Sequence, residues 1–151
     1  NYIQHSTSWS EWALLFCLFL FPTLSLYDGG SIGALLPSIQ LYFSTTDSLA
    51  ASITTFNSLA HGLGLAVMWL FGDLLPKRAI FFSAIALWIV FICSAVLATV
   101  NQFLVFVALR ATSSFFAEIA ILSVSVIQAE LFKGRMLTFS IMSNIFGISV
   151  A

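Results

Sequence analysis

Long apolar runs separated by short polar breaks dominate this chain. Most of these runs reach the roughly 20 residues that an α-helix needs to cross the hydrocarbon core of a bilayer. Backbone groups in hydrocarbon must be hydrogen-bonded within the segment, and the strict alternation of a membrane barrel strand is absent, so we expect α-helices. We expect the last span to be only the beginning of a helix. The five predicted spans cover residues 12–40, 48–71, 79–100, 103–129 and 136–151.

The polar breaks between the spans also predict an orientation. Lys77 and Arg78 lie in the second break and Lys133 and Arg135 in the fourth, whereas the first and third breaks carry no Lys or Arg. Loops on the cytoplasmic side of a membrane are enriched in these two residue types. We therefore expect the second and fourth breaks, together with the tail over residues 1–11, on the cytoplasmic side.

The composition supports a membrane protein. Of 151 residues, 60% are hydrophobic and 7% are charged, and the mean hydropathy is +1.06. Soluble domains are about a quarter charged, so this chain has too much apolar surface for a water-soluble fold. The net charge of −1 offers no basic surface for nucleic acid. We predict an all-α integral membrane protein whose surrounding partner is the lipid bilayer.

Polar residues follow helical spacing in three of the four complete spans, whereas the third span is nearly bare. Residues at positions i, i+3, i+4 and i+7 share one face of a helix. We therefore expect the third helix to face lipid and the other three to face something polar. The stripes contain Thr23, Tyr27, Asp28 and Ser31 in the first span, Thr54, Asn57, Ser58 and His61 in the second, and Arg110, Ser114, Glu118, Ser125 and Gln128 in the fourth.

Three ionisable residues, Asp28, Arg110 and Glu118, lie far from either end of their spans. A charge at the middle of a bilayer costs about 2.5–3.5 kcal/mol on insertion scales. Arg110 and Glu118 are about 12 Å apart along a helix axis at 1.5 Å per residue, too far for a direct pair. Each should meet another helix, and Asp28 is the visible candidate partner.

These charges have two interpretations. They either hold helices together, as polar groups in membranes do, or line a pathway for a substrate and protons. Two acids and one base on separate helices favour the pathway, because a carboxylic acid in a partly dry cavity can exchange a proton near neutral pH. His61 is either a hydrogen-bonded structural residue or a member of the same proton relay. Gly29, Gly30 and Pro37 should make the first helix bendable and admit another backbone or a substrate.

An enzyme is not expected from this sequence. We find no metal-binding cluster, nucleophile triad or phosphate-binding loop, and Cys17 and Cys93 match no metal or redox spacing. No cofactor is therefore predicted.

The succession of polar and bare helices resembles the amino-terminal half of the major facilitator superfamily, in which the first and fourth helices line the cavity and the third is peripheral. The break "FGDLLPKRAI" is similar to the superfamily's cytoplasmic signature between the second and third helices. Asp73, Lys77 and Arg78 match its charged positions, and the resemblance implies that they form a cytoplasmic gate. The alternative is anchoring of charged residues at the membrane surface.

Within the superfamily, two segments resemble the Spinster-like lipid transporters. The segment "LYDGGSIGALLPSIQLYFSTTDSLAASITTF" is similar to their first-to-second helix region, and "LRATSSFFAEIAILSVSVIQAELFKGRMLTFSI" to their fourth-helix region. Gly29 stands where the family has arginine, and Phe115 and Phe116 where it has glycines. The matching positions are Tyr27, Asp28, Ala34, Pro37, Ile39, Phe43, Asp47, Ser48, Thr55 and Phe56 in the first segment, and Arg110, Glu130, Leu131, Phe132 and Arg135 in the second.

The resemblance implies a secondary active transporter, either proton-coupled or uncoupled, for amphipathic lipids such as lysophospholipid or sphingosine phosphate. It implies a lysosomal or plasma membrane location and cavity roles for Asp28, Arg110 and Glu118. Residues 12–151 would form part of an amino-terminal six-helix bundle whose partner is a carboxyl-terminal half. Two alternatives stay open: a transporter of small organic anions, since Arg110 would serve a carboxylate equally well, and a truncated or degenerate membrane protein that does not transport.

Overall fold

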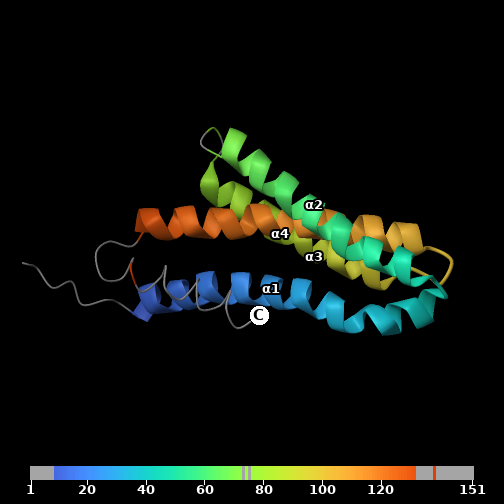
Figure 1. The fold of residues 1–151 in the computed structure, drawn as a ribbon. Coiled ribbons are helices and arrows are strands. Elements are labelled where there is room, and N and C mark those ends of the chain that lie inside the picture. Colours follow the sequence, from blue (N-terminus) through green and yellow to red (C-terminus); the bar gives the residue numbers. More distant parts are fainter. Residues whose placement is uncertain (1–8, 73, 75, 132–137, 139–151) are drawn as a thin grey trace, which may run out of the picture.

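Four α-helices make up the computed structural model, which describes residues 9–72, 74, 76–131 and 138 (Figure 1). The secondary structure of these residues is all α-helix and turn, which confirms the all-α expectation. Asp47 begins the second helix after Ser44 adopts a positive φ of 51°, and the Gln40 side chain donates a hydrogen bond to the Asp47 carboxylate at 3.0 Å. The helices are α1 (Trp9–Phe43), α2 (Asp47–Phe71), α3 (Lys77–Val96) and α4 (Phe103–Leu131).

Helix α4 is the centre of the bundle. It packs against each of the other three helices, most extensively against α2 and α3 and less extensively against α1 (Figure 1). Helix α3 buries few of its large side chains, and Phe82, Leu87, Ile89 and Val90 are exposed on it. An apolar, exposed surface of this kind is what lipid contact requires.

Two apolar clusters fill the inside of the bundle, one toward each end. Both clusters join α1 to α4, and because residue numbers rise along α1 as they fall along α4, the two helices run antiparallel. The charged residues Asp28 of α1 and Arg110 and Glu118 of α4 lie between the clusters along their helices. The first cluster contains Leu18, Phe21, Phe81, Ala84, Ile119, Ala120, Val124 and Ile127, and the second contains Ile32, Phe43, Ile53, Ala98, Phe103 and Val107.

Three of the helices are long and apolar enough to cross a membrane: α2, α3 and α4 as far as Glu130. Helix α1 is not among these three candidates. The structure therefore supports three of the five predicted spans as candidate membrane helices. The fifth span, 136–151, lies almost wholly outside the described residues.

Two helix ends differ from the approximate bounds of the predicted spans. Helix α1 begins at Trp9, within the segment predicted as a tail over residues 1–11. The third helix was predicted to residue 100 but ends at Val96, since the N–H groups of Leu97 and Ala98 already bond to carbonyls three residues back. Residues 97–102 form the turn into α4, in which the Gln102 side chain accepts a hydrogen bond from the Thr99 N–H at 3.3 Å.

Candidate functional site

The polar layer between the two apolar clusters is centred on a pair of charged residues from α1 and α4. Arg110 Nη1 donates to Asp28 Oδ1 at 3.1 Å, and Arg110 Nη2 donates to Asp28 Oδ2 at 2.9 Å. The planar guanidinium group matches a carboxylate in this two-bond geometry, which is a strong form of ion pair. Arg110 is only 7% exposed, whereas the Asp28 side chain is 31% exposed, so the pair is buried on its arginine side.

Burial leaves part of Arg110 unsatisfied. Its Nε atom is buried and has no hydrogen-bond partner in the described part of the chain. Most buried polar atoms in proteins have hydrogen-bond partners. The Arg110 Nε–H is an exception, and it is an unpaired donor within the described polar layer. Ser113 and Ser114 are buried beside Arg110 on α4, and Ser113 donates its hydroxyl to the Arg110 carbonyl at 2.7 Å.

A second pair joins α2 to α4. His61 Nδ1 lies 3.0 Å from Glu118 Oε2, and the two side chains are 37% and 21% exposed. Arg110 and Glu118, two turns apart on α4, are therefore each paired with a different helix.

Gly64, one turn beyond His61, lets α2 and α4 come close. A Cβ atom on Gly64 would lie 2.9 Å from the Phe115 carbonyl oxygen and 3.0 Å from Glu118 Cβ. Small residues at helix contacts allow such close packing in membrane proteins. The sequence analysis missed this position, although the small residues of "HGLG" beside a polar stripe are a signal that could have found it.

A cavity of about 270 Å³ lies between α1 and α2, beside the polar layer. We call it the α1/α2 cavity. Gly29 is part of its wall, and a Cβ atom there would meet nothing within 4 Å. The expected close approach of another backbone at Gly29 is therefore not found, and the missing side chain leaves open space instead. The lining residues are Ser25, Leu26, Gly29, Gly30, Ile32, Thr54, Asn57, Ser58 and His61.

Lys77 and Arg78, two of the three residues predicted to form a cytoplasmic gate, lie at the far end of the bundle from the turn between α1 and α2. Lys77 Nζ donates to Glu130 Oε1 at 2.9 Å, which ties the beginning of α3 to the end of α4. Arg78 is exposed, and Asp73 lies outside the described residues.

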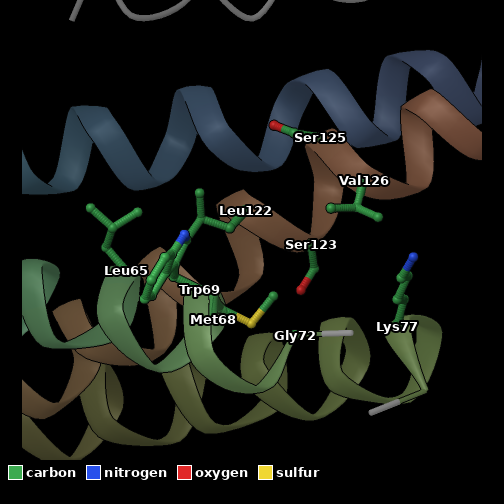
Figure 2. Close-up of a pocket in the computed structure, with 9 residues that line it drawn as sticks. All are labelled: Leu65, Met68, Trp69, Gly72, Lys77, Leu122, Ser123, Ser125 and Val126. Atoms are coloured by element: carbon green, nitrogen blue, oxygen red, sulfur yellow. The ribbon is translucent and has the colours of Figure 1, made fainter. Parts of the chain in front are cut away.

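A second cavity, of about 260 Å³, lies beside Lys77 between α2 and α4 (Figure 2). Its walls are mostly apolar, and Trp69, which stands at its edge, is 84% exposed. Figure 2 shows Lys77 at one end of this cavity and Leu65 and Trp69 at the other.

The described part of the chain is thus an all-α four-helix protein with three candidate membrane-spanning helices, which points to a multi-pass membrane protein. Its described residues contain no group of three or more His, Cys, Asp or Glu side chains placed to hold a metal ion. Comparison with protein-family models, curated proteins and solved structures gives no match for this chain.

Proposed function

We propose that the chain is the amino-terminal part of a secondary active transporter with the major facilitator fold, which moves amphipathic lipids such as lysophospholipid or sphingosine phosphate by alternating access. The observation that carries this proposal is the two-bond ion pair between Asp28 and Arg110, placed in a polar layer between two apolar clusters. The proposal includes further helices of the same transporter, among them a carboxyl-terminal half.

The ion pair suggests how substrate and proton are coupled. While Asp28 is ionised, it occupies the Arg110 guanidinium group. A proton on Asp28 removes that negative charge and frees Arg110 to bind the phosphate of a lipid head group. Coupling of this kind is reciprocal, so binding of the anion also favours protonation of Asp28.

Glu118 and His61 would provide a second place for a proton. Their contact joins α2 to α4, so a change of charge at either residue alters the attraction between these helices. The His61 to Glu118 pair and the Lys77 to Glu130 pair at the proposed cytoplasmic end each join two helices. Under this proposal, these two contacts change between an inward-facing and an outward-facing state. A ligand shifts such an equilibrium only through its different affinities for the two states.

Uptake by proteoliposomes tests this proposal. The full-length protein would be reconstituted, and uptake of a labelled lysophospholipid measured with and without an imposed pH gradient. Asp28→Asn keeps the size of the side chain but cannot titrate, so we expect gradient-driven uptake to be lost. Asp47→Asn is the matched control, because Asp47 is exposed at the beginning of α2 and bonded to Gln40 near the end of α1. Unchanged dependence on the gradient in Asp28→Asn would refute the coupling mechanism.

One observation favours a second candidate, a membrane protein that does not transport. Asp28, Arg110, His61 and Glu118 already satisfy one another in pairs, as residues that only hold helices together would. This candidate predicts no uptake of any probe by the wild-type protein, together with a loss of stability in Asp28→Asn. Competition by small organic carboxylates separates the remaining alternative, a transporter of organic anions, from a lipid carrier.

A further inference from the structure

Two buried polar atoms of opposite hydrogen-bonding character have no partner in the described part of the chain. Arg110 Nε on α4 carries an N–H that can only donate, and Asn57 Oδ1 on α2 is an amide oxygen that can only accept. The two residues are 7% and 8% exposed. Native proteins rarely leave such atoms unsatisfied, because they lose their bonds to water and gain none in return. A donor and an acceptor that are both unsatisfied can satisfy each other if they lie close together.

The register between α2 and α4 follows from two places where these helices meet. A Cβ atom on Gly64 of α2 would lie 3.0 Å from Glu118 Cβ of α4. Ile53 and Val107, which precede these two residues by the same number of positions, belong to one apolar cluster. Residue numbers therefore rise together along α2 and α4, and the register is the same at both places.

This register sets Asn57 beside Arg110. Asn57 lies on the buried face of α2, one turn after Ile53, and Arg110 lies in the turn of α4 that follows Val107. Asn57 is also part of the wall of the α1/α2 cavity, but its Oδ1 atom is buried. The oxygen therefore faces the interior of the bundle, where α4 lies, and not the cavity.

Ser114 adds a third polar group at the same level. It lies one turn after Arg110 on α4 and is 7% exposed, and its hydroxyl can both donate and accept. A buried water in a protein makes about three hydrogen bonds to groups that are otherwise unsatisfied. One N–H donor, one amide oxygen and one hydroxyl are a suitable set of partners for such a water.

We propose that one buried water links Arg110 Nε to Asn57 Oδ1, and that Asn57 is a positioning residue for Arg110. The water accepts from Nε–H, donates to Oδ1 and bonds to the Ser114 hydroxyl. Arg110 is then held from α1 through its two Nη atoms, by Asp28, and from α2 through Nε. The role of the link rests on the proposed function. When a proton on Asp28 releases the guanidinium group, the link keeps the Nη atoms directed at the site where the anionic group of the substrate binds.

Proton exchange at Arg110 Nε–H tests the link directly. The full-length protein would be labelled with ¹⁵N-arginine and placed in nanodiscs, and the Nε–H signal of Arg110 would be assigned by its loss in Arg110→Lys. In the wild-type protein we expect slow exchange with the solvent, together with magnetisation transfer from Nε–H to a long-lived water. Rapid exchange would overturn the proposal, as would the absence of transfer to such a water.

Two substitutions of similar size separate hydrogen bonding from packing at Asn57. Asn57→Leu removes the acceptor, so exchange at Nε–H should become about tenfold faster or more, whereas an unchanged rate would refute the link. Asn57→Asp keeps an acceptor and should keep exchange slow. Asn101→Leu is the matched control, because it removes an exposed asparagine in the turn before α4 and should change nothing. If Asn57→Leu does not fold, Asn57→Asp decides the question, because a charged acceptor should slow exchange below the wild-type rate.

Uptake kinetics in proteoliposomes test the positioning role. Asn57→Leu should raise the KM for the labelled lysophospholipid by about tenfold, because Arg110 is less well oriented to bind the anion. Dependence on the pH gradient should stay, because Asp28 still titrates. An unchanged KM would refute the positioning role. No uptake by the wild-type protein would refute the proposed function, whereas slow exchange that depends on Asn57 would still support the water link.

Discussion

Arg110 on α4 holds Asp28 on α1 through two parallel hydrogen bonds of 3.1 and 2.9 Å, at a level where no apolar cluster joins the two helices. Helix α1 packs less extensively on α4 than α2 and α3 do. The Asp28 to Arg110 pair is therefore an important contact that holds α1 against α4. The pair therefore links the ionisation of one carboxylate to the position of a whole helix. A helix attached in this way can change its position at a smaller cost than one attached by a continuous apolar surface.

The energetic character of this pair can be tested with single and double substitutions. Asp28→Leu leaves Arg110 buried with its partner gone, and breaking a buried pair in this way costs about 3–5 kcal/mol. Replacing both residues removes the uncompensated charge, so Asp28→Leu combined with Arg110→Leu should recover most of that loss. Unfolding of the purified protein in mixed micelles, titrated with a denaturing detergent, measures the free energies of Asp28→Leu, Arg110→Leu and the double variant.

The same measurement on Thr112→Leu combined with Asp47→Leu provides a control, because neither residue takes part in the pair. The effects of these two distant substitutions should simply add. If the changes in unfolding free energy caused by the Asp28 and Arg110 substitutions were also additive, the pair would contribute no coupling energy. Its role in holding α1 against α4 would then be refuted.

Gly64 offers a test of the contact between α2 and α4. Gly64→Ala places a methyl group 2.9 Å from the backbone oxygen of Phe115, which cannot move without moving α4. We expect the helices to separate and the protein to lose about 1–3 kcal/mol of stability, as overpacked cores do. Gly62→Ala, two residues away on the same helix, should be neutral or stabilising, since its Cβ atom would meet nothing within 4 Å. Equal effects of the two substitutions would contradict the close approach at Gly64.

Spacing along the chain predicted one half of the site well. Arg110 and Glu118 are too far apart on one helix to pair, and this fact alone directed Arg110 to another helix, with Asp28 as the candidate. The partner of Glu118 was not identified, because His61 fits a structural role and a relay equally well until the rotation of α2 against α4 is known. That rotation depends on Gly64, and a close approach between two helices is a tertiary property that the pattern of a single helix does not contain.

Gly29 shows a second limit of the sequence. A glycine in this polar stretch was expected to admit either another backbone or a substrate, and the structure has open space there instead of a backbone contact. Whether a missing side chain admits a neighbouring helix or leaves a cavity depends on the position of that helix. The helix boundaries near Val96 were missed for a related reason, because apolar residues continue through the turn that follows.

The Lys77 to Glu130 pair predicts a separation of stability from activity. These side chains are 32% and 56% exposed, and exposed pairs contribute about 0–1 kcal/mol. Glu130→Gln should therefore leave the unfolding free energy almost unchanged. If the pair closes the proposed cytoplasmic end, the same substitution should alter the rate of lipid uptake in proteoliposomes. A large loss of stability would instead assign the pair a structural role.

Gly29 also provides a test in which uptake and stability change in opposite directions. A Cβ atom there has open space, and alanine is favoured over glycine within a helix by roughly 0.5–1 kcal/mol, so Gly29→Ala should stabilise the protein. Gly29→Leu places a larger side chain at the wall of the α1/α2 cavity and should slow uptake of the labelled lysophospholipid by proteoliposomes without destabilising the bundle. Gly33→Leu is the matched control, because it has the same open surroundings on α1 but is not part of the cavity wall. If Gly29→Leu and Gly33→Leu both take up the lipid as the wild-type protein does, the α1/α2 cavity takes no part in transport, because a filled cavity cannot admit a substrate.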